Sequence, residues 1–384
     1  MGRLVKIVVA MDSLKGSLSS IRAGEAVKKG ILNVCNADVV IKPLADGGEG
    51  TVEALVEGMR GVYQSVKVHG PLLEERVCQY SYIEESHTVV IEMANAAGLP
   101  LVPKHLRNPM ITTTYGVGEV IYHAIKRGGR NFIIGIGGSA TCDAGIGMLS
   151  ALGYEFLDKN YKLVSYRGKA LSQIEYIKSD HVLPEVKDCT FKIACDVTNP
   201  LYGENGAAYI YGPQKGASIE DVKILNDGLI HFSEIVTKTF GSKNEMVYGA
   251  GAAGGLGYAF LSFLNATLEP GIEIILELTG LEKELEHADY VITGEGQLDD
   301  QTAMGKAPIG IAKLAKKYGA KVIALAGSVS DKAGKCNEYG IDAYFSIVNS
   351  PISLEEAMDI ENAEKNLILT TEQIFRLIKA VDKK

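Results

Sequence analysis

Acidic side chains end or follow several predicted strands, where carboxylates could orient hydroxyl groups, accept a proton or hold a divalent cation. They are Asp12, Asp46, Glu49, Asp196, Glu295 and Asp299. Because the carboxyl ends of parallel strands share one edge of a sheet, we expect these carboxylates to gather at such an edge. Taken singly, each could instead cap a helix or stabilise a turn, as Asp299 could do for the helix predicted after it.

Lysines and hydroxyl groups beside glycines complete a set that suits phosphoryl transfer. Three lysines adjoin glycines, and three hydroxyl groups lie in glycine-containing segments: Lys15, Lys215, Lys306, Ser13, Ser139 and Thr141. Catalysis of phosphoryl transfer is mostly positioning and charge neutralisation, which carboxylates, ammonium groups and N–H-rich loops can provide. The alternative for any single lysine is an ordinary solvated surface position.

Glycines are the compositional outlier, with 43 among 384 residues, and they cluster in predicted loops. The clusters DGGEG, GGSAT and TGEG are each predicted to follow an apolar strand and to precede a helix. They contain Gly47, Gly48, Gly137, Gly138, Gly294 and Gly296. Glycine at such a position lets ligand oxygens approach backbone N–H groups at a helix N-terminus. Tight turns are the alternative, and the shared position of three such loops favours binding.

Common catalytic fingerprints are absent from the sequence, apart from one dinucleotide-like motif. There is no G-x-x-x-x-G-K-[ST] phosphate loop, no G-x-S-x-G elbow and no HExxH zinc motif. GAGAAG at residues 249–254 matches G-x-G-x-x-G and precedes the apolar segment YAFLSFL. An NAD(P)-linked oxidoreductase is therefore one alternative function, although the strand EMVYGA predicted before the motif is short.

The elements that must position these residues alternate between strands and helices at both ends of the chain. Continuous apolar runs predict five buried strands at residues 5–11, 38–44, 289–293, 321–327 and 343–348. Helices are predicted at residues 20–31, 51–59, 307–319 and 371–381. This alternation favours an open, flavodoxin-like parallel sheet. Residues 65–98 instead carry short alternating strands typical of antiparallel pairs, and further strands are predicted at 131–137 and 191–197.

We therefore predict an α/β protein in which a second, mixed-sheet α/β domain is inserted into a flavodoxin-like domain with an open parallel sheet. The flavodoxin-like domain is discontinuous and comprises residues 1–64 and 286–384, and the inserted domain comprises residues 65–285. The interface between two such domains would form a cleft, where small-molecule sites commonly lie. The active site is expected in this interdomain cleft.

Composition and charge argue against several classes of partner. The formal charge of −8 and the pI near 5.5 argue against nucleic-acid binding. The six cysteines form no CxxC pair, so neither a zinc site nor a disulfide framework is indicated, and a reducing cytoplasm fits best. The N-terminal apolar run of about seven residues is too short for a secretion signal or a membrane span, so we expect no membrane partner.

Six long segments resemble, in the same order and across nearly the whole chain, the type I glycerate kinases. They are MDSLKGSLS, PLADGGEGTVEAL, GIGGSATCDAGIGML, ACDVTNPLYGENGAAYIYGPQKGA, GAGAAGGLGYA and TGEGQLDDQTAMGKAPIGIAKLAKK. The resemblance implies the same two-domain fold and the phosphorylation of D-glycerate by ATP and Mg²⁺, with 2-phosphoglycerate as the expected product. This sequence departs from the family at Met11, Cys142, Ala144 and Gln297, where proline, asparagine, glycine and arginine are usual.

The resemblance also suggests roles for the residues named above. Asp196 is expected to position or deprotonate the substrate hydroxyl, while Lys15 and Lys215 neutralise the substrate carboxylate and the transferring phosphoryl group. Candidate Mg²⁺ ligands are Asp46, Glu295 and Asp299. Substrate or nucleotide contacts are expected from Asp12, Ser13, Asp46, Gly47, Gly48, Glu49, Gly137, Gly138, Ser139, Thr141, Gln214, Gly294, Glu295, Gly296 and Lys306. A non-catalytic sensor of small hydroxy acids on the same scaffold is the remaining alternative.

Overall fold

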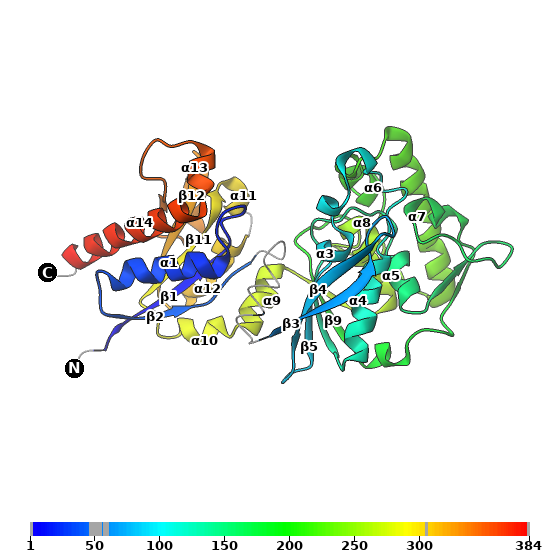
Figure 1. Ribbon diagram of the computed structural model, residues 1–384, viewed down its shortest axis with the longest axis horizontal. Coiled ribbons are helices and arrows are strands. Elements are labelled where there is room, and N and C mark those ends of the chain that lie inside the picture. Colours follow the sequence, from blue (N-terminus) through cyan, green and yellow to red (C-terminus); the bar gives the residue numbers. More distant parts are fainter. Residues whose placement is uncertain (1–2, 46–55, 57–60, 304–305, 382–384) are drawn as a thin grey trace. The chain divides into compact units, whose positions relative to one another are not determined.

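The computed structural model describes residues 3–45, 56, 61–303 and 306–381 (Figure 1). Within them the chain divides into two compact units. Residues up to 45, together with residue 56 and residues 272–381, form the first unit, and residues 61–271 form the second. None of the helices in these ranges is both long enough and apolar enough to cross a bilayer. The helix predicted at residues 51–59 lies outside the described residues, apart from residue 56.

The first unit is built on a parallel sheet of five strands in the order β13-β12-β11-β1-β2. The strands are β1 (Val5–Met11), β2 (Ala37–Ile41), β11 (Tyr290–Leu298), β12 (Lys321–Val329) and β13 (Ala343–Ser346). Counted along the chain, this order is 2-1-3-4-5, which is the flavodoxin-like arrangement. The predicted open parallel sheet is therefore confirmed. Ile7, Val8 and Val9 of β1 are all fully buried, because helices cover both faces of the sheet.

Right-handed crossovers place helices on both faces of this sheet. The steps from β1 to β2 and from β11 to β12 run in opposite directions, so α1 (Ser20–Leu32) and α12 (Ala307–Lys317) cover opposite faces. Helix α14 (Ile360–Val381) packs against α1 so closely that a Cβ added at Gly30 would lie 2.7 Å from the Ile368 carbonyl oxygen (Figure 1). Further α-helices in the described part of the unit are α9 (Gly271–Leu278), α10 (Leu281–Leu285), α11 (Asp300–Ala303) and α13 (Leu354–Met358).

The second unit contains a mixed sheet of six strands in the order β10-β9-β6-β5-β4-β3. The strands are β3 (Val62–His69), β4 (Glu75–Ile83), β5 (Thr88–Glu92), β6 (Asn131–Gly135), β9 (Thr190–Ala194) and β10 (Thr267–Glu269). The pairs β3–β4 and β4–β5 are antiparallel, as the alternating pattern of residues 65–98 predicts, while β5, β6, β9 and β10 run parallel. The carboxyl ends of these four parallel strands therefore share one edge.

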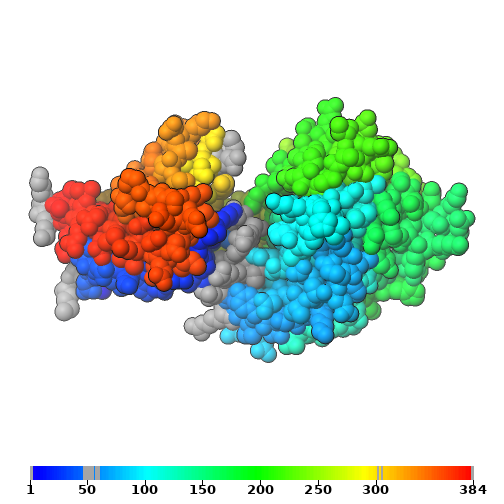
Figure 2. Space-filling model, turned by 45° about the horizontal axis from the view of Figure 1, so that its top comes forward, coloured from blue at the N-terminus to red at the C-terminus, as the bar shows by residue number. Residues whose placement is uncertain are grey.

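Helices and a small hairpin complete the second unit. They are α3 (Ala94–Ala97), α4 (Tyr115–Lys126), α5 (Ile146–Ala151), α6 (Ala207–Tyr211), α7 (Ile219–Phe240), α8 (Ala252–Phe263) and the strands β7 (Glu155–Leu157) and β8 (Tyr176–Lys178). Figure 2 shows this unit in cyan to green, and it also shows the orange-red segment around α13 at the surface of the first unit. The core of the second unit joins α4, α7 and α8 to the sheet through side chains such as Ile121, Phe232 and Tyr258, all fully buried.

Two local predictions about glycine-rich segments are wrong. The segment TGEG is not a loop, since Gly294, Glu295 and Gly296 lie within β11, where Gly294 pairs with Leu325 and Glu295 with Ala326 of β12. The segment EMVYGA is a series of turns and not a strand, so GAGAAG lacks the strand that a dinucleotide-binding motif requires.

The glycines of GAGAAG have a packing role at the start of α8. A Cβ added at Gly254 would lie 2.1 Å from the Thr141 carbonyl oxygen, and one at Gly251 would lie 2.1 Å from that of Pro200. Gly254 also has a φ of +68°, which L side chains rarely adopt. Close approach of α8 to two neighbouring loops therefore accounts for these glycines without a nucleotide.

Candidate active site

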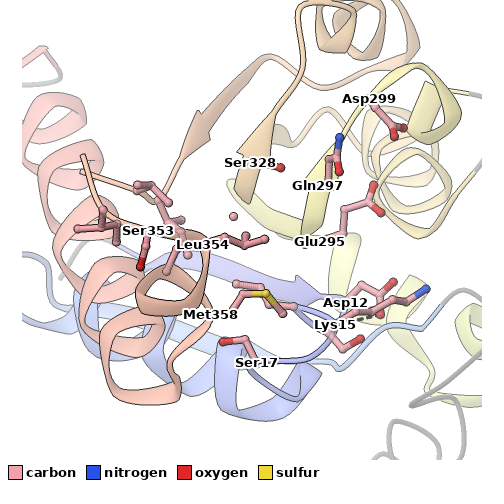
Figure 3. Close-up of a pocket in the computed structure, with 18 of the residues that line it drawn as sticks. Asp12, Lys15, Ser17, Glu295, Gln297, Asp299, Ser328, Ser353, Leu354 and Met358 are labelled. Carbon is pink, nitrogen blue, oxygen red and sulfur yellow. Dashed lines mark hydrogen bonds between the residues drawn. The ribbon is translucent and has the colours of Figure 1, made fainter. Parts of the chain in front are cut away.

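A cavity of about 700 Å³ opens at the carboxyl edge of the parallel sheet in the first unit (Figure 3). Its polar lining includes Asp12, Ser13, Lys15, Glu295, Gly296, Gln297, Asp299 and Lys306. These side chains come from the loop after β1, from β11 and from the segment between β11 and α12. The first unit thus brings together most of the residues that the sequence predicted for it, and Gly294 lies one residue before Glu295 in β11.

Pairing of β1 with β11 positions Asp12 in this pocket. Met11 pairs with Gly294, and the next backbone N–H, that of Asp12, donates to the Gly294 carbonyl oxygen at 2.9 Å. The Asp12 carboxylate accepts a hydrogen bond from the Ser13 backbone N–H at 2.6 Å. Asp12 is only 2% exposed, so the end of a buried strand holds its carboxylate at the sheet edge.

Glu295 is the most enclosed acid of the pocket lining after Asp12, at 7% exposed. Its Oε1 accepts a hydrogen bond from Thr302 Oγ1 at 2.7 Å, and its Oε2 lies 3.5 Å from Lys306 Nζ. Burial raises the pKa of Glu295, the bond from Thr302 and the charge of Lys306 oppose that rise, and the neighbouring Asp299 adds to it. The carboxylate is thus held between a hydroxyl donor and an ammonium group.

Asp299 immediately precedes the short helix α11. Its Oδ1 accepts a hydrogen bond from the Thr302 backbone N–H at 3.0 Å, which is an N-cap interaction. The sequence predicted Asp299 as a possible cap for the helix at residues 307–319, but that helix, α12, has Lys306 at its N-cap and no side-chain capping bond, so Asp299 caps α11 in its place and also lines the pocket. Lys306 precedes the first turn of α12, and Lys15 is exposed in the loop after β1, so two cations flank the acids.

A second polar cluster lies in the second unit around Lys215, which is 3% exposed. Its Nζ donates hydrogen bonds to Ser139 Oγ and to the Thr141 carbonyl oxygen, each at 2.7 Å. Burial lowers the pKa of Lys215 from 10.5 to about 8, although Cys142 and Asp143 oppose the shift. Thr141 Oγ1 is also buried and has no hydrogen-bond partner among the described residues. An ammonium group and an unused hydroxyl are the equipment of an anion-binding site.

The loop that carries Ser139 and Thr141 follows β6, and it includes the exposed Gly137 and Gly138. Lys215 reaches the loop from the end of the 3-10 helix η5 (Pro213–Lys215), which also carries the exposed Gln214. The structure thus brings together the residues that the sequence predicted in GGSAT and in GPQKG. It does so although these segments are far apart along the chain.

Asp143 supports this loop, although it is not among the residues predicted from the sequence. Its Oδ2 accepts hydrogen bonds from Thr114 N and Thr114 Oγ1, both at 2.8 Å, and its Oδ1 accepts one from Gly145 N at 3.2 Å. Asp143 is fully buried, and burial raises the pKa of its carboxyl group against the effect of those bonds. Its place two residues after Thr141, in a glycine-rich segment, was the available signal in the sequence.

Asp196 follows β9 at the edge where the loop after β6 also begins. Gly135 of β6 pairs with Ala194 of β9, so the two loops leave the sheet at the same level. The Asp196 Oδ1 accepts a hydrogen bond from the Gly271 backbone N–H, the first residue of α9, at 3.0 Å. Asp196 is exposed, so solvent or a substrate can reach its carboxylate. The expected carboxylate is therefore at the same sheet edge as Ser139.

Four of the predicted site residues lie outside the described residues: Asp46, Gly47, Gly48 and Glu49. The expected active site in an interdomain cleft also stays a prediction. Within the part of the chain that the structure describes, no group of three or more His, Cys, Asp or Glu side chains is placed to hold a metal ion. Mg²⁺ commonly binds through one or two carboxylates together with phosphate oxygens and water. Glu295 and Asp299 suit that pattern, since both line a pocket that also carries two lysines.

Along nearly its whole length, the chain is similar to known glycerate kinases. A family model described as the glycerate kinase family matches residues 7–379. The glycerate kinase of Halalkalibacterium halodurans is 44% identical over 371 residues, which cover 95% of this chain and 98% of that protein. The glycerate 2-kinase of Escherichia coli is 44% identical over 372 residues, with the same coverage. A crystal structure assigned as glycerate kinase 2 from Salmonella typhimurium matches 100% of both chains with a TM-score of 0.91 at 40% identity.

Proposed function

The chain belongs to the glycerate kinase family, and we propose that it transfers the γ-phosphoryl group of ATP to the 2-hydroxyl of D-glycerate. The family requires ATP as the co-substrate and a small hydroxy acid as the acceptor. The observation that carries the proposal is the buried Lys215 beside Ser139 and Thr141. The Escherichia coli relative, named a glycerate 2-kinase, supports the 2-hydroxyl as the acceptor.

In this reaction the oxygen of the substrate hydroxyl forms a bond to the γ-phosphorus, and the bond from that phosphorus to the β-γ bridging oxygen breaks. ADP leaves, and the hydroxyl proton passes to a base. We assign the base to Asp196, because its carboxylate is exposed and is anchored to the Gly271 N–H at the end of β9. The Lys215 ammonium group, with two N–H donors already bound, offers its third to an anionic oxygen of glycerate.

The pocket of the first unit supplies the groups that phosphate requires. Lys15 and Lys306 bring positive charge, and Asp12, Glu295 and Asp299 bring carboxylates. We propose that Glu295 and Asp299 contact Mg²⁺ when it accompanies the nucleotide, and that the ion supplies charge neutralisation on the phosphate oxygens. The Thr302 hydroxyl and the Lys306 ammonium group would then keep the Glu295 carboxylate in place.

Neither alternative function has a comparable observation in its favour. The NAD(P)-linked oxidoreductase depended on GAGAAG, which follows turns and serves to pack α8. A non-catalytic hydroxy-acid sensor would bind glycerate and yet release no ADP. We also place the reaction in the cytoplasm, because all six cysteines are free thiols.

A coupled assay of ADP release by the purified protein tests this proposal. With ATP and Mg²⁺ present, D-glycerate should start ADP release, and L-glycerate should do so far more slowly. Glycerate binding without ADP release would contradict the kinase and favour the sensor. A change in NADH fluorescence on mixing with the protein would favour the oxidoreductase.

A further inference from the structure

The pocket of the first unit has an apolar wall opposite its charged groups. Ile352, Leu354 and Met358 lie on or just before α13, and they line the cavity together with Leu14 and Ile347. In Figure 3, Leu354 lies on the α13 side, whereas Lys15, Gln297 and Asp299 lie toward the opposite side. The cavity therefore has one charged end and one apolar end.

The apolar wall is exposed, and the helix that carries Leu354 and Met358 has a capped start. Leu354 is 75% exposed, and Met358 and Ile352 are 38% and 37% exposed. A capping box fixes the start of α13, because Ser353 Oγ accepts a hydrogen bond from Glu356 N while Glu356 Oε2 accepts one from Ser353 N. Solvated apolar side chains on an ordered helix beside a pocket are typical of a ligand-binding surface.

Met358 connects the apolar wall to the loop that carries Lys15. A Cβ added at Gly16 would lie 2.7 Å from Met358 Cε, so α13 sits directly on the loop between β1 and α1. Gly16 has a φ of +79°, which suits glycine at this tight approach. The apolar and charged ends thus belong to one continuous pocket.

Glycerate does not match this combination of features. It has three carbons, each bearing an oxygen function, so it offers no apolar face to Leu354 or Met358. A cavity of about 700 Å³ is also in the range that holds drug-sized ligands, far larger than glycerate. ATP, in contrast, carries a flat aromatic base at one end and a triphosphate at the other.

We propose that this pocket binds the nucleotide, with the adenine base against Ile352, Leu354 and Met358 and the phosphates toward Lys15 and Lys306. The inference rests on the proposed function, because that function names ATP as the phosphoryl donor. It adds α13 to the binding site, a segment that none of the glycine-rich motifs contains. Contact of a purine with aliphatic and thioether side chains is an ordinary source of affinity for such a ligand.

Calorimetric titration with ADP and, separately, with D-glycerate tests the assignment in the presence of Mg²⁺. The variant is Leu354→Glu, which places a negative charge at the base-binding wall without disturbing a packed core. The matched control is Leu377→Glu on α14, at a leucine that is 62% exposed and does not line the pocket. We expect Leu354→Glu to weaken ADP binding at least about tenfold and to leave glycerate binding unchanged, while Leu377→Glu changes neither.

Other outcomes overturn the inference. The inference is wrong if Leu354→Glu binds ADP as tightly as the wild-type protein does. It is also wrong if Leu354→Glu loses affinity for glycerate and not for ADP, or if the wild-type protein binds no ADP. Failure of the proposed function is separately visible. In that case the wild-type protein binds ADP, and Leu354→Glu weakens the binding, but no ADP is released from ATP when glycerate is added.

Discussion

Lys215 Nζ lies 2.7 Å from Ser139 Oγ, although 76 residues separate the two along the chain. The contact joins the loop after β6 to the helix η5, and both residues are buried. A buried ammonium group is costly unless it is hydrogen-bonded or serves an anion. Its place beside a glycine-rich loop at the carboxyl edge of parallel strands makes Lys215 the central residue of the proposed chemistry.

Replacing Lys215 with methionine should separate catalysis from stability. Methionine has a similar length but no charge, so we expect kcat/KM for glycerate to fall by about 10²–10³-fold. The free energy of unfolding should not fall, because the cost of burying a charge is removed with the charge. Steady-state kinetics and urea denaturation measure the two effects. An unchanged kcat/KM would remove Lys215 from the reaction.

The lowered pKa of Lys215 predicts a basic limb in the pH profile. Burial brings this pKa to about 8, so the group is charged below that pH and neutral above it. If the charged form is required, kcat/KM should decline as the pH rises through about 8. Lys215→Arg should move the decline to higher pH, because a guanidinium group stays charged. If kcat/KM stayed constant from about pH 7 to about pH 10, a range that spans this titration, the charged form of Lys215 would not be required.

The same pKa shift has a predictable effect on stability. The pKa in the folded state is below the ordinary value of 10.5, so the unfolded chain binds more protons between about pH 8 and pH 10.5. The stability contributed by this group is therefore full above pH 10.5 and is lost as the pH falls through about 8. Comparison of wild-type protein with Lys215→Met across this range isolates the contribution from those of other groups.

Asp196 can be tested with a pair of substitutions. Asp196→Asn keeps an oxygen that can accept the Gly271 N–H but cannot take a proton, whereas Asp196→Ala loses both properties. We expect kcat to fall by about 10²–10⁴-fold in both variants, with the thermal midpoint near the wild-type value for Asp196→Asn. Wild-type kcat in Asp196→Asn would exclude Asp196 as the base.

The packing role of GAGAAG predicts a contrast between two glycines. Gly254 and Gly241 both have φ near +70°, but only Gly254 has backbone atoms within reach of an added Cβ. Gly241→Ala should cost about 1 kcal/mol from backbone strain, and Gly254→Ala should cost clearly more because it collides with Thr141 O. Urea denaturation compares the two free energies of unfolding. Equal costs would contradict the packing account.

Residues 289–298 show where sequence patterns stop predicting structure. The continuous apolar pattern predicted the parallel strands of the first unit, since strands buried on both faces must be apolar throughout. It ended the predicted strand that starts at residue 289 at Thr293, because glycine and glutamate, which follow as Gly294, Glu295 and Gly296, are uncommon in strands. Pairing with Leu325 and Ala326 of β12 extends β11 to Leu298, and this tertiary contact is invisible in the local pattern.

The residues of the candidate site likewise fall into those that the sequence could identify and those that it could not. Lys215, Ser139 and Asp12 lie in conspicuous motifs, so they could be named as candidates from spacing and residue type, and the structure places Lys215 beside Ser139, and it places Asp12 in the pocket lining. Asp143 and Leu354 could not, because their importance comes from what folds against them: the N–H group of Thr114 in one case and a pocket in the other. Burial and pocket shape are properties of the folded chain rather than of its motifs.

Phosphorus NMR of the product formed from ATP, Mg²⁺ and D-glycerate tests the central claim most directly. The account predicts ADP together with a phosphomonoester whose resonance is split into a doublet by the single proton on carbon 2. A triplet from the two protons on carbon 3 would contradict transfer to the 2-hydroxyl while leaving the kinase in place. A spectrum that shows only ATP, with no new ester, would contradict the kinase itself.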